Sequence, residues 1–115
     1  MAETQGPLTA AMFHVLLALV NEDRHGYAIL KEVDEETEGE VQLSTGTLYG
    51  IIKRLLTNGH IQEVRKPGAK NTDSRRRYYH LTDEGRRAAI AEAKRMEKLV
   101  VCARSKRLIR TLSSA

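Results

Sequence analysis

Cysteine, tryptophan and long hydrophobic runs are scarce or missing in this sequence of 115 residues. It contains one cysteine, no tryptophan and one phenylalanine. A single cysteine excludes a disulfide framework within the chain and favours the cytoplasm. The longest apolar run, near Met12–Val20, is far shorter than the ~20 residues that cross a membrane. The start Met1-Ala2-Glu3-Thr4 also lacks the basic residues of a secretory signal. We therefore expect a cytoplasmic protein with no membrane partner.

The shortage of aromatic side chains limits the hydrophobic core. Aromatic residues make up 4% of the chain and hydrophobic residues 41%, so the core must consist mainly of leucine, isoleucine, valine and alanine. A domain of this length with so small a core is only marginally stable by itself. The composition therefore favours one domain that associates with a second copy.

Charge is distributed unevenly along the chain. Residues 1–40 contain nine acidic and two basic residues, for a net charge of −7, whereas residues 41–80 contain eight basic and two acidic residues, for a net charge of +6. A basic region next to an acidic one is typical of a surface that attracts a polyanion in one place and repels it elsewhere. A solvated surface of mixed charge is the alternative interpretation.

Capping residues and apolar periodicity predict four helices. The expected ranges are 10–20, 26–37, 45–58 and 83–112, and Thr9, Ser44 and Thr82 are the expected N-caps. The last helix would be roughly 45 Å long at 1.5 Å per residue. Such a helix is too long to pack wholly against so small a domain.

Two extended stretches lie between the third and last helices. Ile61–Arg65 and Arg75–Leu81 flank a loop rich in turn residues and lysine, which predicts a β-hairpin with a basic tip. Tyr79 and Leu81 should share the inner face of the second strand. A short strand is also expected at 41–43, and residues 21–24 are expected to form a turn.

The order of these elements is that of a winged helix-turn-helix domain, so the expected fold is mainly α with a small β-hairpin. We assign residues 9–81 to a DNA-binding domain and residues 82–115 to a C-terminal dimerisation helix. Leu99–Ala103 is apolar all round the last helix, and Cys102 within it should be buried. One chain can cover only one side of this turn, which makes a homodimer the economical solution.

Three motifs resemble the PadR-like family of transcriptional regulators. They are His25-Gly26-Tyr27, Leu43-Ser44-Thr45-Gly46-Thr47-Leu48-Tyr49, and Arg77-Tyr78-Tyr79-His80-Leu81-Thr82-Asp83-Glu84-Gly85. The resemblance covers roughly residues 9–90, in the right order and spacing. The sequence departs from the family at Gly50, where a proline often follows the tyrosine.

The resemblance implies a homodimer joined through the first and last helices. The third helix would enter the major groove of double-stranded DNA, and the hairpins, or wings, would contact flanking DNA. Family members mostly repress transcription, and some release DNA when they bind a phenolic acid or a drug. A two-fold symmetric dimer further predicts a pseudo-palindromic operator.

The candidate DNA-binding residues lie on the third helix and in the hairpin. Tyr49 and Lys53 lie opposite the apolar face and could reach base edges or phosphates. For Tyr49, packing beneath the wing is the alternative. The full predicted set is Ser44, Thr45, Thr47, Tyr49, Lys53, Lys66, Lys70, Arg75, Arg76 and Arg77.

A small aromatic effector is a further expectation that rests on the resemblance. Phe13, Leu17, Met96 and Val100 would line its site where the first and last helices of two chains meet. No cofactor or metal is expected, because the histidines are dispersed and no metal-spacing motif occurs. No catalytic signature is present, so an enzyme is not expected. The alternative function is a winged-helix protein–protein interaction module without specific DNA binding.

Overall fold

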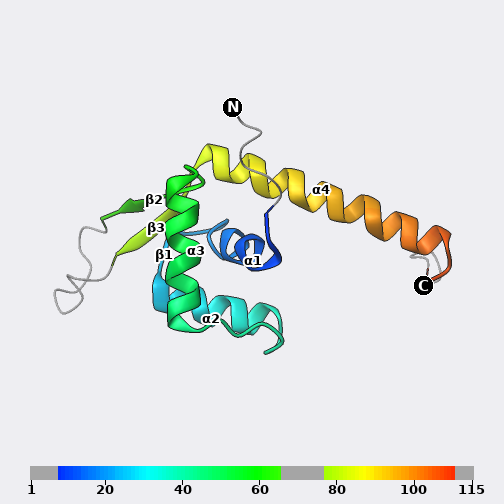
Figure 1. Cartoon of the computed structure of the whole chain (residues 1–115), viewed down its shortest axis with the longest axis horizontal. Helices are drawn as coiled ribbons and strands as arrows, with labels where there is room; N and C mark the ends of the chain where they lie inside the picture. The colour runs from blue at the N-terminus through cyan, green and yellow to red at the C-terminus, as the bar shows by residue number, and fades with distance from the viewer. Residues whose placement is uncertain (1–7, 66–76, 111–115) are drawn as a thin grey trace.

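The computed structural model describes residues 8–65 and 77–110, which form four helices and a three-stranded antiparallel sheet (Figure 1). The architecture is mainly helical with a small sheet, as the sequence predicts. The elements in chain order are α1 (Ala10–Ala18), β1 (Arg24–His25), α2 (Gly26–Glu36), α3 (Thr45–Thr57), β2 (Ile61–Val64), β3 (Tyr78–Leu81) and α4 (Asp83–Ser105).

All three predicted N-caps are confirmed. The side-chain oxygens of Thr9, Ser44 and Thr82 each accept a hydrogen bond from the backbone N–H three residues later, at 3.1, 3.1 and 3.0 Å. The fourth cap is His25, whose Nδ1 accepts from the N–H of Ala28 at 3.2 Å. Each cap satisfies one of the backbone donors that a helix start leaves unpaired.

The core forms around α1, which contacts α2, α3 and α4 (Figure 1). Aliphatic side chains dominate it, as expected from the shortage of aromatic residues. Its most deeply buried members are Val15, Leu16, Leu19, Ile29, Val33, Leu48 and Leu55.

The sheet has the strand order β1-β3-β2. Tyr79 on β3 pairs with Arg24 on β1, and Leu81 on β3 pairs with Ile61 on β2. Tyr79 and Leu81 are both buried, which confirms the predicted inner face. The hairpin strands are shorter than expected: β2 ends at Val64, and β3 begins at Tyr78.

The third strand is not where the sequence predicted it. Residues 41–43 are unpaired in the sheet, because the N–H of Val41 bonds to the side-chain oxygen of Thr37 at 3.0 Å and its side chain packs on the core. Arg24, expected in a turn, instead begins β1. The prediction of a strand at 41–43 was therefore wrong.

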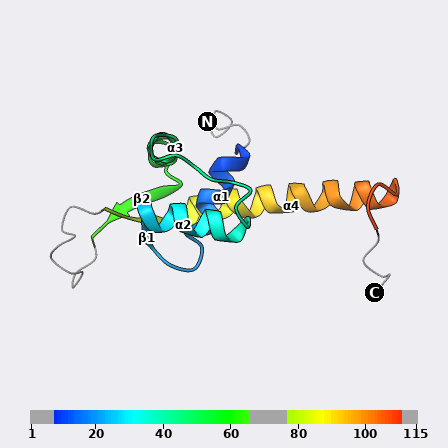
Figure 2. The same cartoon turned by 90° about the horizontal axis from the view of Figure 1, so that it is seen from below.

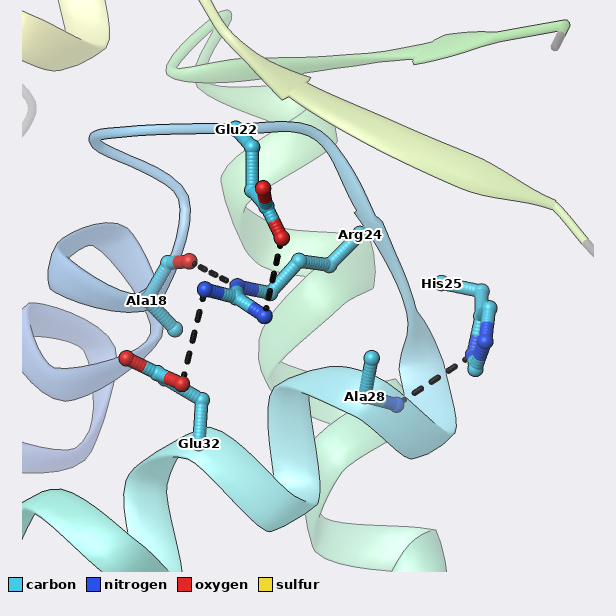
Figure 3. A network of polar contacts seen from close by, with 6 residues as sticks. All are labelled: Ala18, Glu22, Arg24, His25, Ala28 and Glu32. Atoms are coloured by element: carbon cyan, nitrogen blue, oxygen red, sulfur yellow. Dashed lines mark hydrogen bonds and ion pairs between the residues drawn. The ribbon is translucent and has the colours of Figure 1, made fainter.

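Arg24 is held in place by a polar network that joins α1, β1 and α2 (Figure 3). Its Nε donates to the carbonyl of Ala18 at 2.7 Å, and its guanidinium lies 3.3 Å from Glu22 and 3.4 Å from Glu32. The side chain is only 20% exposed. These contacts tie the end of α1 to α2 and set the extended backbone that pairs with β3.

Helix α4 extends well beyond the rest of the molecule in both views (Figures 1 and 2). It ends at Ser105 rather than near Leu112, so it is about 35 Å long at 1.5 Å per residue. Arg107 has a left-handed φ of 64°, and the N–H of Leu108 bonds back to Ala103 at 2.9 Å. This C-terminal closure ends the helix earlier than apolar periodicity predicted.

The distal part of α4 carries apolar side chains that the chain itself does not cover. Leu99 is 58% exposed, Val101 57% and Leu108, just beyond the helix, 79%. Cys102 is also exposed within the single chain, so its expected burial stays a prediction that depends on a second copy. Burial of this segment therefore requires something outside the single chain.

Candidate nucleic-acid interface

Helix α3 has one buried face and one exposed face. Leu48, Ile51, Ile52 and Leu55 are buried against the core. The opposite face exposes Thr45, Gly46, Tyr49, Gly50 and Lys53. In Figure 2 α3 is seen nearly end-on and projects from one side of the molecule. The apolar contacts thus hold the helix, while the polar face remains accessible to a ligand.

The start of α3 is fixed by two hydroxyl groups. The Ser44 Oγ accepts from the N–H of Thr47 at 3.1 Å, and its own hydroxyl donates to the Thr47 Oγ1 at 2.9 Å. Both residues are exposed. The two hydroxyls therefore lie at the positive end of the helix dipole, where an anion is favoured.

Tyr49 is 47% exposed, but the tip of its side chain turns inward. Its hydroxyl lies where a Cβ on Gly26 would be, against the first residue of α2. Burial raises the pKa of Tyr79, and the nearby Glu63 and Tyr49 raise it further, while Arg77 opposes them. The tip of Tyr49 therefore packs against α2, while the packing beneath the wing and the DNA contact that the sequence suggested stay predictions.

The base of the wing brings opposite charges together. Arg77 Nε lies 3.1 Å from the Glu63 carboxylate, and their side chains are 69% and 44% exposed. This pair neutralises part of the charge that the sequence assigned to DNA binding. The other predicted wing residues, Lys66, Lys70, Arg75 and Arg76, lie outside the described residues.

Aromatic side chains gather where α2 begins, which sequence reasoning did not predict. The ring of His25 stacks on Tyr27 at a centroid distance of 6.5 Å and meets Tyr78 edge-on at 5.3 Å. Tyr27 is 62% exposed. The contact with Tyr78 depends on the pairing of His25 with Tyr78 across β1 and β3. Only a sequence signal for β1 could have indicated it.

Strand β3 and helix α2 carry further polar contacts. The Nδ1 of His80 lies 2.7 Å from the Asp23 carboxylate, which connects β3 to the segment before β1. Burial raises the pKa of Glu36, and the hydrogen bond and negative charge of Glu32 raise it further, against Arg24 and His14. Glu32 and Glu36 of α2 thus lie close to Arg24.

A short joint connects α3 to α4. The N–H of Thr82 donates to the carbonyl of His60 at 3.1 Å, and the Thr82 hydroxyl donates to the carbonyl of Gly59 at 2.6 Å. His60 is 3% exposed, and in the described part of the chain its Nδ1 has no hydrogen-bond partner. Burial lowers the pKa of His60, and the charge of Glu84 partly offsets this effect.

The four predicted effector residues lie on two helices that pack together, α1 and α4. Phe13 is buried and Met96 packs against the core, whereas Leu17 and Val100 are 37% and 38% exposed. The chain therefore brings the two helices together but leaves Leu17 and Val100 partly uncovered. An effector site at this position remains a prediction.

Two further properties concern only residues 8–65 and 77–110. None of their helices combines the length and apolar character needed to cross a membrane. Within the same ranges, no three histidine, cysteine or acidic side chains lie together in a way that could hold a metal ion.

Comparison with known proteins identifies relatives of the whole winged-helix region. The family model "Transcriptional regulator PadR-like family" matches residues 15–91. An uncharacterised protein of Lysinibacillus sphaericus is 29% identical over 72 residues, which are 63% of this chain and 64% of the relative. The chain thus matches just under two thirds of that relative's length.

Solved structures share the fold at low sequence identity. A PadR family transcription regulator of Clostridium difficile R20291 superposes with a TM-score of 0.69 at 24% identity, covering 88% of this chain and 100% of its own. Bordetella bronchiseptica BpsR, whose DNA binding is described as regulated by 6-hydroxynicotinic acid, superposes with a TM-score of 0.65 at 23% identity. The match covers 87% of this chain and 67% of its own. Bacillus subtilis PadR in complex with operator DNA superposes with a TM-score of 0.58 at 20% identity, and the match covers 74% of this chain and 47% of its own.

Proposed function

This chain belongs to the PadR-like family of transcriptional regulators, whose members are regulators and not enzymes, and we propose that it binds double-stranded DNA as a homodimer and represses transcription. Its site of action would be the cytoplasm. The operator would be pseudo-palindromic, with half-sites about one helical turn, or a multiple of it, apart.

The observation that carries this proposal is the division of α3 into two faces. Leu48 and Leu55 are fully buried and hold the helix, while Thr45 and Lys53 on the other face are exposed. This geometry suits a helix that enters the major groove, because the contacts to base edges do not compete with the contacts to the core. The basic residues of the segment 65–77 would add sequence-independent contacts to phosphates.

The homodimer part of the proposal is supported by the exposed apolar segment of α4. Leu99 and Val101 are more than half exposed, although fully burying such a side chain is worth about 1.5–3 kcal/mol. A second copy of the chain presents the same segment and can bury it by two-fold symmetry. Each copy would then place its own α3 on one half-site.

A small aromatic effector is a further part of the proposal. The Bordetella relative's DNA binding is described as regulated by 6-hydroxynicotinic acid, a small aromatic acid. Leu17 and Val100 would complete a site of this kind only once a second chain covers them. Thermal-shift screening with phenolic and planar compounds tests the idea, and a screen without any stabilising compound favours a regulator that needs no effector.

The decisive experiment is the salt dependence of binding to duplex DNA, measured by fluorescence anisotropy. If the dimer neutralises about 6–10 phosphates, its affinity for random duplex should fall by roughly a thousandfold or more between about 50 and 200 mM salt. Replacing Lys70 and Arg76 together by alanine should make this dependence shallower for all sequences alike. Lys31→Ala, which removes one base from the acidic part of the chain, is the control for loss of positive charge elsewhere and should leave the slope unchanged.

A flat salt response would contradict the proposal. It would favour the alternative, a winged-helix module that binds another protein through the same surface.

A further inference from the structure

Two of the motifs singled out in the sequence meet at one contact. Gly26 begins α2 and is buried, and Tyr49 lies in the second turn of α3. A Cβ built on Gly26 would overlap the Tyr49 hydroxyl and lie 2.9 Å from the Cζ atom of the ring. It would also approach Leu48 Cδ2 at 3.5 Å, which is an ordinary contact. The phenol tip therefore occupies the space that any larger residue at position 26 would need.

Space, and not backbone conformation, is what requires glycine at this position. The described glycines with a positive φ are Gly39 and Gly59, so Gly26 has a backbone conformation that alanine adopts readily. Alanine is also the better helix former. By contrast, a Cβ at Gly46 or Gly50, on the exposed face of α3, would meet nothing within 4 Å.

The position of the Tyr49 ring affects the surface proposed to contact DNA. Thr45, Tyr49 and Lys53 follow one another at intervals of four residues, so they lie along one stripe of α3. Tyr49 is anchored at its tip against α2 but is still 47% exposed. Its hydroxyl is thus turned toward α2 and away from a ligand approaching that stripe, while part of the side chain stays exposed on the same stripe as Thr45 and Lys53.

We propose that Gly26 is a positioning residue for DNA recognition, because the space it leaves at the start of α2 holds the Tyr49 ring in place on the exposed stripe of α3. This inference rests on the proposed function and deepens it. It assigns the ring of Tyr49, and not its hydroxyl, to the selection of the preferred DNA site. It also gives His25-Gly26-Tyr27 a role in recognition through a neighbouring helix.

The test compares affinity for a preferred duplex, selected from random sequences with the unaltered protein, and for random duplex at the same salt. Gly26→Ala should displace the ring, lower the affinity for the preferred duplex about tenfold, and change that for random duplex much less. Tyr49→Leu, which removes the ring, should have the same effect. Adding Gly26→Ala to Tyr49→Leu should then change neither affinity, because no phenol is left to displace.

Tyr49→Phe separates the ring from the hydroxyl. It keeps the ring and should keep the ratio of the two affinities within about twofold of the unaltered protein. The outcome that overturns the proposal is an unchanged ratio in Tyr49→Leu, or a Gly26→Ala effect that is equally large with and without the tyrosine ring. Loss of the ratio in Tyr49→Phe would also overturn it, since recognition would then depend on the hydroxyl.

A parallel measurement without DNA distinguishes failure of this inference from failure of the proposed function. In chemical unfolding, Gly26→Ala should destabilise the unaltered chain but not the Tyr49→Leu variant, and Gly50→Ala is the matched control that should not destabilise either. If the unaltered protein bound no duplex DNA, the proposed function would fail. The unfolding comparison would still show whether Gly26 and Tyr49 are in contact. If Gly26→Ala did not fold, the Tyr49→Leu and Tyr49→Phe ratios would decide the role in recognition.

Discussion

Two exposed helix surfaces of this chain differ in chemistry, although both lack contacts to the core. The outer face of α3 is mainly polar, with Thr45 and Lys53 beside the partly exposed Tyr49. The distal part of α4 is apolar, with Leu99 and Val101 more than half exposed. Water solvates the first surface without penalty, whereas the second costs roughly 25 cal/mol for each Å² of apolar surface left in water. Exposure therefore predicts a partner for the distal part of α4, whereas the face of α3 is stable in water and free to meet a charged ligand.

The course of α4 explains why its distal part is exposed. Near its start, Gly85 and Ala89 are buried against the domain, and the backbone of His60 approaches Gly85 closely. Farther along, Glu92 is buried and its carboxylate lies 3.2 Å from Arg95 Nε. Beyond Met96 the domain no longer covers the helix, and the apolar residues continue into solvent. The polar face of α3 suits a polyanion, and this apolar extension suits a second copy of the chain.

The largest expected effect comes from placing charge on the apolar extension. Leu99→Glu combined with Val101→Glu removes about 1.5–3 kcal/mol of burial for each side chain, so dimerisation should weaken by more than about a hundredfold. Analytical ultracentrifugation over a range of concentrations measures this. Because the fold from Leu8 to Ala89 does not use either side chain, the helical circular dichroism should persist at high concentration.

Lys98→Glu is the matched control, because it changes the net charge by the same amount without removing an apolar side chain. It should leave the dimer largely intact. Equal dissociation in both variants would mean that charge, and not apolar burial, determines association.

The next effect tests the polar surface. Lys53→Ala should cost about 1–3 kcal/mol of binding free energy at the preferred duplex and less on random duplex, if Lys53 contacts base edges. The free energy of unfolding should stay the same, because Lys53 is exposed and opposite the buried leucines. Anisotropy titrations and urea unfolding measure the two quantities. Equal losses on both duplexes would reassign Lys53 to phosphate contact.

A smaller effect concerns the joint between the two surfaces, where His60 is buried. Burial lowers the pKa of His60, so the folded chain holds it neutral while the unfolded chain takes up a proton below about pH 6.5. The unfolded state then binds more protons than the folded state. The free energy of unfolding should therefore decrease as the pH is lowered, by at most about 1.4 kcal/mol per pH unit. The loss should begin near the unfolded pKa and level off below the folded one.

His60→Leu removes this proton and should flatten the pH dependence of urea unfolding between about pH 7 and 5.5. Glu84→Gln removes a carboxylate that raises the pKa of His60, so the NMR titration of His60 should move to lower pH. An unchanged pH dependence in His60→Leu would show that other groups cause it.

The smallest expected effect is stabilisation at the exposed face of α3. A Cβ at Gly50 meets nothing within 4 Å, so Gly50→Ala should raise the free energy of unfolding by about 0.5–1 kcal/mol. Gly46→Ala should behave in the same direction. Destabilisation by Gly50→Ala would mean that the outer face of α3 is packed against something, which would remove the contrast with its buried side.

Much of the fold could be predicted from local signals. Thr9, Ser44 and Thr82 cap helices because a hydroxyl three residues before a backbone donor needs only local geometry. The two faces of α3 follow from the spacing of Leu48, Ile52 and Leu55. Strand β1 could not be predicted, because two residues carry no periodicity and Arg24 is extended through its contacts with α1 and α2.

The candidate site was predictable to a smaller degree. The exposure of Thr45 and Lys53 follows from helix periodicity alone. The inward turn of Tyr49 does not, since it depends on the space beside Gly26 in another helix. The pairing of Arg77 with Glu63 likewise depends on the register of β2 and β3, which brings their side chains together across the hairpin.

The sequence by itself determined the helix starts, the buried face of α3, the inner face of β3 and the excess of apolar residues late in α4. These properties depend on neighbours within a few positions, where backbone geometry fixes which side chains share a face. Only the tertiary structure decided which residues form the third strand and where the rings of His25 and Tyr49 lie. Those outcomes depend on which distant segments compete for the same space and the same backbone hydrogen bonds. Contacts between distant segments leave no periodic pattern in the sequence from which they could be predicted.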